Sequence, residues 1–502
     1  MTGRSSQSKY DVIIIGGGNT ALLTALQANE AGAKVLVLEK APKQYRGGNG
    51  YFTTGIYRIV HNGIEDVKDL IPDLTDEERN LDIPAYSADD FFRDYMRITE
   101  DMPDPELTEV LISESTEAIR WMVKKQGLKM ELTGLGLSRV DGRLVYNFNM
   151  PIQSKGGGAG LSDALYSKIE EKGIELLYDA SATKLLVDDV SGRVCGVRVR
   201  NKGEMQEIKC KAAILACGGF ESNPQWRAQY LGKGWDMVKV RGTRYNMGDG
   251  LRMALEIGAQ PTGNWSGCHA IFIDADAPQP AIREDTEKTS RRTYNLGIIV
   301  NIDGKRFVDE GEDEIVFTYA RFGQTVISQP QRIAFQVFDS KIQPILKTLS
   351  DYSGAPYTAG DTIEELADKL GIDPECFKQT VKEYNDASKP GGTLDPTRMA
   401  GLLQGENRQA QGILPLKSNW AYPMDKPPFY AYPVCCGITF TFGGIKINKR
   451  AQVLDNYDNP IPGLYASGEI VGGFFYNNYP GATGLCSGVV FGRIAGANAA
   501  TD

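Results

Sequence analysis

The chain has 502 residues, which is long enough for two or three domains with sizeable hydrophobic cores. Its net charge of −9 is mild and spread along the chain, which argues against nucleic acid or an anionic membrane as the main partner. No apolar run approaches about 18 residues, and no signal peptide pattern precedes the first expected strand. The sequence therefore predicts a cytoplasmic protein without a transmembrane segment.

The cysteines and histidines exclude several classes of site. Eight cysteines show no CxxC spacing, and the only two histidines in the sequence are His61 and His269. Zinc and iron–sulfur sites need clusters of these residues, and disulfide frameworks are typical of small secreted chains. The sequence therefore predicts no bound metal and no disulfide framework.

The segment from Asp11 to Lys40 predicts a nucleotide-binding unit. Val12 to Ile15 is a short run of β-branched residues, typical of a parallel strand buried on both faces. Three glycines follow, and apolar residues then recur at helical spacing until Gly32, before a second strand from Val35 to Leu38. A strand, a glycine turn, a helix and a second strand in this order are typical of ADP binding.

Two glycines and one acidic residue of this unit are expected to determine how it binds a nucleotide. Gly16 permits the tight turn, and Gly18 lets the backbone approach a pyrophosphate at the N-terminus of the helix. Glu39 ends the second strand, where it can accept hydrogen bonds from ribose hydroxyls and would repel a 2′-phosphate. A glycine-rich turn without a ligand is the alternative, and the two framing strands favour the nucleotide.

Two more glycine clusters follow in the first half of the chain. Gly47-Gly48-Asn49 comes after the second strand, where backbone amides could approach the second half of a cofactor, and a plain loop is the alternative. Residues 62–130 have a broken helical rhythm that predicts an inserted helical layer. The segment from Lys155 to Leu161 opens another helix, which runs to Gly173.

The middle of the chain predicts strands and a glycine loop. The expected strands are Ile174 to Leu177, Lys184 to Val187, and a hairpin made by Val194 to Val199 and Glu207 to Ala213. The buried strand Ala213 to Ala216 ends near Gly218-Gly219, and the loop 242–250 leads into a helix from Leu251 to Ile257.

Residues 262–435 change in character. They predict short strands, long loops and one amphipathic region from Thr362 to Ser388, with a surface loop around Gly391-Gly392, Pro396 and Gln404 to Gln411. No second nucleotide site is evident, so we expect a separate lobe inserted into the first domain.

The C-terminal segment returns to the first pattern. Gly463 to Glu469 predicts a strand, and Asn478 to Gly488 is a glycine-rich run that leads into a helix from Val489 to Ala499. The N-terminus of a helix offers free amides and a partial positive charge, which would stabilise the negative charge of a reduced flavin. A plain glycine-rich cap is the alternative.

Together these motifs resemble the flavoprotein family of fumarate reductases, succinate dehydrogenase flavoprotein subunits and 3-ketosteroid Δ1-dehydrogenases, and within it tricarballylate dehydrogenase-like proteins. The stretches that carry the resemblance are VIIIGGGNTALLTA, VLVLEK, RGGNG, KGGGAGL, AILACGGFESN, GTRYNMGDG, GKRFVDE, TFTFGGIKIN and LYASGEIVGG…NYPGATGLCSG. The resemblance implies an α/β fold with a Rossmann-like (GR2-type) FAD-binding domain at 1–261 and 439–502, and an inserted α+β capping domain at 262–438.

The resemblance also implies the residues that bind FAD. Glu39 would hold the adenosine ribose, Glu469 the ribityl chain, and neither histidine falls in a motif for covalent attachment, so FAD should be non-covalent. The full expected set is Gly16, Gly18, Asn19, Thr20, Glu39, Lys40, Gly47, Gly48, Asn49, Gly157, Gly158, Thr183, Gly218, Gly219, Asp249, Glu469, Leu485, Cys486 and Ser487.

The catalytic positions only partly follow the family. His269 matches a substrate histidine, but three groups that handle carboxylates in fumarate reductases are replaced here, by Glu314, Phe440 and Tyr479. Fumarate reduction itself is therefore not expected. Tyr479, in a YPG context, is similar to a ketosteroid dehydrogenase tyrosine that donates to a ketone oxygen.

Arg292 and Tyr294 are the remaining catalytic candidates. An arginine near this place lies on the proton path of relatives, and it could anchor a carboxylate with two hydrogen bonds, whereas a solvated basic turn is the alternative. Tyr294 and Glu314 are both candidates for the general base, which stays unassigned.

Three functions follow as hypotheses. The first is an FAD-dependent dehydrogenase that forms a C=C bond α,β to a carboxyl or carbonyl group, acting on a small molecule and passing electrons to an unidentified acceptor. The second is the same scaffold running in reverse as an ene-reductase. The third is a flavin-binding protein without turnover, such as a sensor.

Overall fold

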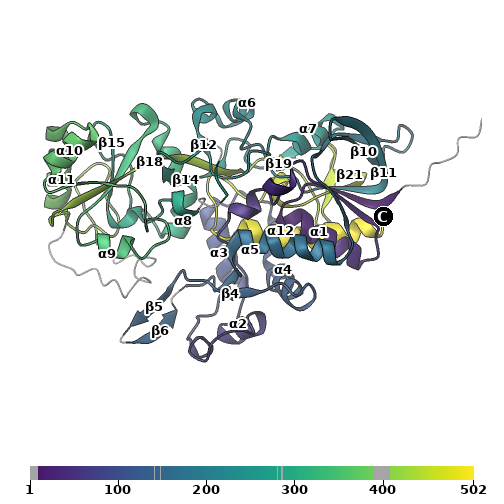
Figure 1. Ribbon diagram of the computed structural model, residues 1–502, viewed down its shortest axis with the longest axis horizontal. Coiled ribbons are helices and arrows are strands. Elements are labelled where there is room, and N and C mark those ends of the chain that lie inside the picture. The colour runs from purple at the N-terminus through teal and green to yellow at the C-terminus, as the bar shows by residue number, and fades with distance from the viewer. Residues whose placement is uncertain (1–8, 141, 147, 280, 284–286, 389–407) are drawn as a thin grey trace, which may run out of the picture.

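The computed structural model describes residues 9–140, 142–146, 148–279, 281–283, 287–388 and 408–502 (Figure 1). The predicted surface loop therefore lies mostly outside the described residues, since only 408–411 belong to them. None of the described helices is long and apolar enough to cross a membrane. Figure 1 shows two large sheets side by side, with a layer of helices beneath the right-hand one.

The first large sheet contains the expected nucleotide-binding unit. Strand β1 (Tyr10–Ile15) lies between β2 (Val35–Leu38) and β11 (Glu204–Leu215), parallel to both. Helix α1 (Asn19–Glu30) connects β1 to β2, as the sequence predicts. The other strands are β8 (Glu175–Leu177), β9 (Ala180–Val187), β10 (Val194–Asn201), β20 (Gln452–Leu454) and β21 (Pro460–Ala466).

Strand β11 plays two parts in this sheet. Its first half pairs antiparallel with β10 in the predicted hairpin, which closes at the pair Asn201 and Glu204. Its second half pairs parallel with β1 and with β21, so the C-terminal segment adds a strand to the N-terminal unit. The two expected strands that met at Ala213 are therefore one continuous strand.

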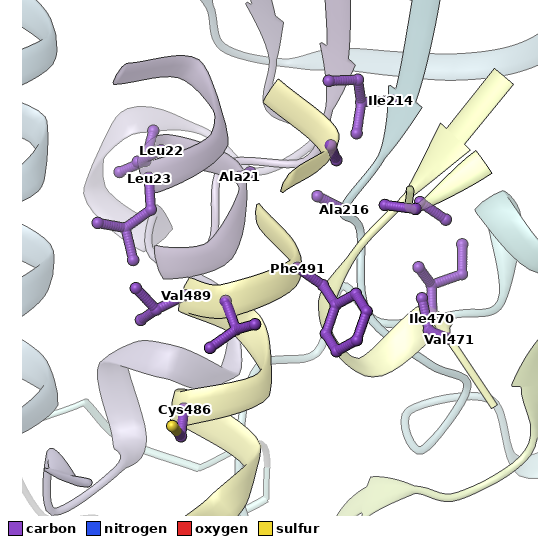
Figure 2. Close-up of a cluster of buried hydrophobic side chains, with 14 of the residues drawn as sticks. Ala21, Leu22, Leu23, Ile214, Ala216, Ile470, Val471, Cys486, Val489 and Phe491 are labelled. Atoms are coloured by element: carbon purple, nitrogen blue, oxygen red, sulfur yellow. The ribbon is translucent and has the colours of Figure 1, made fainter. Parts of the chain in front are cut away.

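Helices α1 and α12 (Thr483–Ala500) lie side by side beneath the sheet. In Figure 2, Leu22 and Leu23 of α1, Val489 and Phe491 of α12, and Ile214 of β11 belong to one hydrophobic core. Glycines of α12 permit this close packing. A Cβ at Gly488 would lie 2.3 Å from Thr20 Oγ1, and a Cβ at Gly496 would lie 2.6 Å from the Thr24 carbonyl oxygen.

The expected helical layer is present beneath these two helices. It consists of α2 (Ile64–Leu70), α3 (Ala88–Ile98) and α4 (Pro105–Lys124), and α4 packs against α12. Helix α5 (Gly157–Glu171) begins at the predicted glycine cluster and packs against α1. Two small sheets lie near this layer. One contains β3 (Ile56–Tyr57), β4 (Met130–Leu132) and β7 (Ile152–Ser154), and the other is the projecting hairpin of β5 (Leu137–Val140) and β6 (Arg143–Tyr146) (Figure 1).

The second large sheet is built around one long strand, β18 (Phe429–Thr441). The sequence predicts only short strands here, and this part of the prediction is wrong because β18 has 13 residues. It pairs with β12 (Lys239–Val240), β14 (Cys268–Asp274), β16 (Ala334–Phe338) and β17 (Thr358–Gly360), and β15 (Ile298–Asn301) follows β16. One of these strands, β12, comes from before residue 262, and the domain boundaries stay a prediction.

The amphipathic region from Thr362 to Ser388 forms two helices. Helix α10 (Ile363–Leu370) ends at Gly371, which has a left-handed φ of +68°, and α11 (Pro374–Ala387) begins after Asp373 caps it. The other helices are α6 (Pro224–Trp226), α7 (Asp249–Glu256), α8 (Ile315–Phe322) and α9 (Gln343–Leu346), and β13 (Pro261–Thr262) pairs with β19 (Gly444–Ile445).

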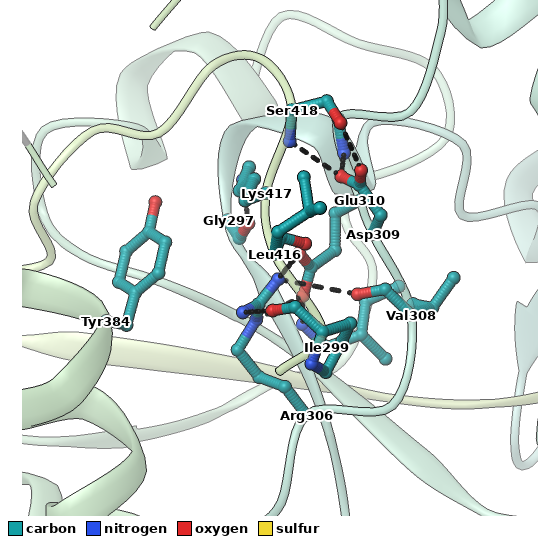
Figure 3. Close-up of polar contacts among 12 residues, drawn as sticks. Gly297, Ile299, Arg306, Val308, Asp309, Glu310, Tyr384, Leu416, Lys417 and Ser418 are labelled. Carbon is teal, nitrogen blue, oxygen red and sulfur yellow. Dashed lines mark hydrogen bonds and ion pairs between the residues drawn. The ribbon is translucent and has the colours of Figure 1, made fainter. Parts of the chain in front are cut away.

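The second lobe contains a buried ion pair (Figure 3). The Arg306 guanidinium donates to both oxygens of Glu310, at 3.0 and 2.5 Å, and also donates to the carbonyl oxygen of Pro415. Lys417, fully buried beside this pair, donates to the carbonyl oxygen of Gly297, and burial lowers its pKa to about 8. These bonds tie residues 415–418 to the edge of β15, so we assign the group a structural role.

We predict that replacing Gly496 with alanine destabilises the protein. The new Cβ would meet the backbone of α1 at Thr24 and Ala28, 2.6 and 3.0 Å away, so the two helices must move apart. Overpacking of this kind costs about 1–3 kcal/mol in the free energy of unfolding. Denaturant unfolding measures it, with Gly134→Ala as the control, because a Cβ at exposed Gly134 meets nothing within 4 Å. Equal stability of the two variants would contradict the predicted tight packing.

Candidate active site

The candidate site is a long cavity with an empty volume of about 1800 Å³, which includes some open solvent. At one end it is lined by Ile15, Leu38, Ala216 and Ser467, which lie at or just after the carboxyl ends of β1, β2, β11 and β21. Ligands of open parallel sheets bind at this edge. The other end reaches the second sheet, at the start of β14 and the end of β18.

Most of the predicted site residues line this one cavity. They come from segments far apart in the sequence, and the fold brings them together. They are Gly16, Gly18, Asn19, Thr20, Glu39, Lys40, Gly48, Asn49, Gly218, Asp249, His269, Arg292, Glu469, Tyr479, Leu485 and Ser487.

Seven predicted residues do not line it, namely Gly47, Gly157, Gly158, Thr183, Gly219, Tyr294 and Cys486. Several of them support the lining from behind. The Gly158 amide donates to the Thr53 carbonyl oxygen at 2.9 Å, and Thr53 lines the cavity. Side chains alternate along β9, so Ala180 and Ala182 line the cavity while the Thr183 hydroxyl donates to the Arg198 carbonyl oxygen.

The two candidates for a general base also lie outside the cavity lining. Tyr294 is buried between Phe272 and Phe322, and its hydroxyl is 2.7 Å from Thr318 Oγ1. Glu314 is half-buried at the start of α8, where burial raises its pKa to about 7. Tyr294 is therefore in contact with Thr318, and Glu314 does not belong to the residues that line the cavity.

The first end of the cavity fits a diphosphate. Gly16 has φ +118°, and a Cβ there would lie 2.2 Å from the Ala216 carbonyl oxygen, so only glycine permits this turn. The turn aims the N-terminus of α1 at the cavity. Asn19 is 4% exposed, and neither atom of its side-chain amide has a hydrogen-bond partner among the described residues. A buried amide without partners indicates a site made for a ligand.

Glu39 lies next to this turn with its carboxylate held in place. Its Oε1 accepts from the Ala41 amide at 2.6 Å, and burial raises its pKa to about 7. A carboxyl group this far from water regains partners when ribose hydroxyls donate to it. Lys40 forms an ion pair with Asp249 at 2.6 Å at the same end, and both side chains are partly exposed.

Farther along, two buried carboxyl groups lie together. Asn246 Nδ2 donates to Glu221 Oε1 at 2.6 Å and to Glu469 Oε2 at 3.3 Å, and Asn49 Nδ2 also donates to Glu221. Burial raises the pKa of Glu469 to about 7, and burial and the neighbouring Glu469 raise the pKa of Glu221 far more. Glu221 Oε2 accepts no hydrogen bond from the described residues, so burial and the neighbouring Glu469 favour the protonated form of Glu221.

The N-terminus of α12 forms the next part of the cavity wall. Gly484, Leu485 and Ser487 in its first turns line the cavity. The Tyr479 hydroxyl accepts a hydrogen bond from the Gly484 amide at 2.9 Å and so caps the helix. Buried Arg58 donates to the Gly481 carbonyl oxygen at 2.9 Å, which fixes the loop just before α12.

Aromatic rings cover the far end of the cavity. We call His269, Tyr319, Phe440, Phe475 and Tyr479 the aromatic wall, because all five line the cavity. The ring centroids of Phe440 and Tyr479 lie 5.0 Å each from the His269 centroid, and the Tyr319 centroid lies 5.1 Å from it. Phe475 lies 5.1 Å from Tyr479 and 5.8 Å from Phe440.

Two arginines border the aromatic wall. Arg292 donates from Nε and Nη2 to the two oxygens of Asp351, at 2.7 and 2.6 Å. Arg241 is buried and donates from Nε to Ser290 Oγ at 3.1 Å. Burial and these two charges hold the pKa of His269 well below its usual range, so its imidazole is neutral.

Sequence reasoning missed part of this lining, chiefly Arg241, Tyr319 and Phe475. Tyr319 lies on α8 within an apolar run that reads as an ordinary helix core. Phe475 lies three residues before the start of the Asn478 to Gly488 run, and this position in the sequence was the available signal.

Comparison with known proteins shows which family the chain matches. A model described as the FAD binding domain matches residues 11–485. The probable fumarate reductase Ifc3 of Shewanella frigidimarina is 29% identical over 97% of this chain and 74% of its own length. The open conformation of a flavocytochrome c3 fumarate reductase superposes with a TM-score of 0.74 at 27% identity, covering 99% of this chain and 79% of that one.

A solved dehydrogenase shares the fold as well. The 3-ketosteroid Δ1-dehydrogenase from Sterolibacterium denitrificans gives a TM-score of 0.74 at 22% identity, over 98% of this chain and 99% of that one. At this identity the likeness concerns the fold.

We predict that Glu469→Gln flattens the pH dependence of stability in the cofactor-free protein. The folded pKa of Glu469 is about 7, above its ordinary value of 4.5, so the folded state binds the proton more tightly. The stabilisation is complete below pH 4.5 and is lost as the pH rises towards 7. Thermal unfolding from pH 4.5 to 8 should show a smaller decline in Tm for the variant than for the native protein. An exposed-site control, Glu204→Gln, should keep the native slope, and identical slopes in all three proteins would contradict the assignment.

Proposed function

Because this chain belongs to the FAD binding domain family, matched over residues 11–485, we propose that it is a dehydrogenase forming a C=C bond α,β to a carboxyl or carbonyl group. The chain is an FAD-dependent oxidoreductase of the class that acts on carbon–carbon bonds. The observation that supports the proposal most is the single cavity. It runs from the sheet edge, where the dinucleotide would bind, to the aromatic wall.

The residues that would hold FAD carry chemical groups that suit the parts of the cofactor. The turn at Gly16 and the amide of Asn19 suit the diphosphate, and Glu39 suits the adenosine ribose. Glu469 would take the ribityl hydroxyls, and the first turn of α12 would lie at the ring system. When bound there, FAD supplies a two-electron acceptor for a hydride from carbon. That the attachment is non-covalent stays a prediction.

The reaction balances as the loss of two hydrogens. One carbon of the substrate gives up a hydride, with its two electrons, and the neighbouring carbon gives up a proton. The electron pair left by that proton forms the new π bond. The two electrons must then pass to an acceptor such as a quinone, dioxygen or a partner protein, which the chain does not identify.

The chain's own contribution is to polarise and enclose the substrate. The acidity of a C–H next to a carbonyl rises when a donor contacts the carbonyl oxygen. The Tyr479 hydroxyl oxygen accepts a hydrogen bond from the Gly484 amide. Its own proton is therefore available to donate to the substrate's carbonyl oxygen. Neutral His269 offers a second uncharged group, since its buried Nδ1 has no partner among the described residues. The aromatic wall excludes water around the reacting carbons.

The second candidate function is the reverse reaction, as an ene-reductase. The relative with 29% identity carries the name of a fumarate reductase, which favours this direction. Against fumarate itself stand Phe440 and Tyr479, which occupy places where the family has a histidine and an arginine for the substrate carboxylates. The potentials of the electron donor and acceptor decide between the two directions.

Anaerobic titration of the flavoprotein tests the proposal. We expect a saturated carboxylic acid, amide or ketone from a panel to bleach the flavin absorbance. If the panel leaves the flavin oxidised, but an unsaturated member reoxidises the chemically reduced protein, the enzyme is a reductase. If neither reaction occurs with any compound, the protein binds flavin without this turnover, and the proposal is wrong.

We predict that Tyr479→Phe lowers kcat by about 10- to 1000-fold while FAD stays bound, because one donor to the developing oxyanion is lost. Tyr294→Phe is the matched control, since its hydroxyl lies outside the cavity lining and contacts Thr318. Rapid-mixing reduction of the flavin measures the chemical step, and the flavin-to-protein absorbance ratio measures occupancy. Unchanged kinetics in Tyr479→Phe, or an equal loss in Tyr294→Phe, would contradict the role of Tyr479.

A further inference from the structure

We propose that the substrate carries a planar aromatic ring, which stacks on Phe440 in the aromatic wall. This inference rests on the proposed function, and it narrows the substrate from any carboxyl or carbonyl compound to a ring-bearing one. The substrate class is thus a carboxyl or carbonyl compound that carries this ring in addition to the saturated CH–CH unit that reacts.

The first support is the extent of aromatic surface at one end of the cavity. Five rings from four separate segments line it, on β14, α8, β18 and the loop before α12. His269, Phe475 and Tyr479 are nearly covered by their neighbours, with 4–8% of their surface exposed. Phe440 and Tyr319 are only half-buried, so their remaining surface is available inside the cavity.

The second support is the orientation of Phe440. Its ring is stacked on the His269 imidazole, with an interplanar angle of 28°. It meets Tyr479 edge-on at 84° and Phe475 at 65°. Rings prefer stacked or edge-to-face contacts, each stronger than area burial alone. Phe440 is thus fixed from three sides, and a planar ligand can extend the existing stack.

The third support is the charge of this surface. His269 is neutral, and burial raises the pKa values of Tyr319 and Tyr479, so all five members of the aromatic wall are uncharged. A small dicarboxylate would leave the apolar ring faces unpaired and place one carboxylate against them, which is unfavourable. A compound with one polar end and one ring matches both the wall and the polar groups at its border.

Phe440 is therefore the residue that we expect to determine ring specificity. Phe442 is the matched control, because it lies behind the wall, 5.6 Å from both Phe440 and Phe475, and does not line the cavity. Phe440→Leu removes an aromatic face and keeps an apolar side chain of similar size, whereas Phe442→Leu makes the same change outside the cavity.

The experiment measures binding to the FAD-loaded protein by calorimetric titration with benzoate and with acetate. The two ligands share a carboxylate and differ by the ring. We expect benzoate to bind at least 10-fold more tightly than acetate, and Phe440→Leu to weaken benzoate binding about 3- to 10-fold with no change for acetate. Phe442→Leu should keep the native ratio of the two affinities.

Two results would overturn the inference. One is equal affinity of the native protein for both ligands, and the other is an unchanged benzoate-to-acetate ratio in Phe440→Leu. A fluorescence-monitored thermal melt of each variant shows that it is folded before titration. Because this binding readout needs no turnover, a failure of the proposed reaction leaves the ring preference separately measurable.

Discussion

The close packing of α1 against α12 is the constraint on which the rest of the site depends. Gly488 and Gly496 let the two helices approach until one more carbon atom would collide with Thr20 or with the backbone at Thr24. Their N-termini consequently open on the same cavity, although they are more than 450 residues apart in the sequence. Two helix N-termini, each with a partial positive charge, then face the same ligand site.

The same arrangement explains why carboxyl groups can be buried here. Glu39, Glu221 and Glu469 lie in or behind the cavity wall, and burial raises the pKa of each. Backbone amides and the Asn246 side chain hold them in place, so they are positioned before any cofactor binds. The opposite end of the cavity is formed by the uncharged aromatic wall. A polar end and an aromatic end suit a cofactor at the first and a substrate at the second.

Much of the cofactor end could be predicted from the sequence, because local signals determine it. The glycine turn at Gly16 and the acid at Glu39 follow from rules about turns and strand ends. The last helix was expected as well, but α12 begins at Thr483, six residues before the expected Val489, so part of the glycine-rich run is already helical. The substrate end could not be predicted in this way. Tyr319 and Phe475 reach the cavity only because α8 and the segment before α12 pack against β14 and β18. The long strand β18 could not be predicted either, since its four pairing partners, β12, β14, β16 and β17, come from separate segments of the chain.

The mass of the product from a reacting compound shows whether this enzyme forms a C=C bond. A compound that bleaches the flavin under anaerobic conditions would be recovered and analysed by mass spectrometry and proton NMR. The account predicts a product that is two hydrogen atoms lighter, with a new C=C bond adjacent to the carboxyl or carbonyl group. A product that has lost its hydrogens from a C–O or C–N bond, with the carbon–carbon bond still saturated, would contradict it.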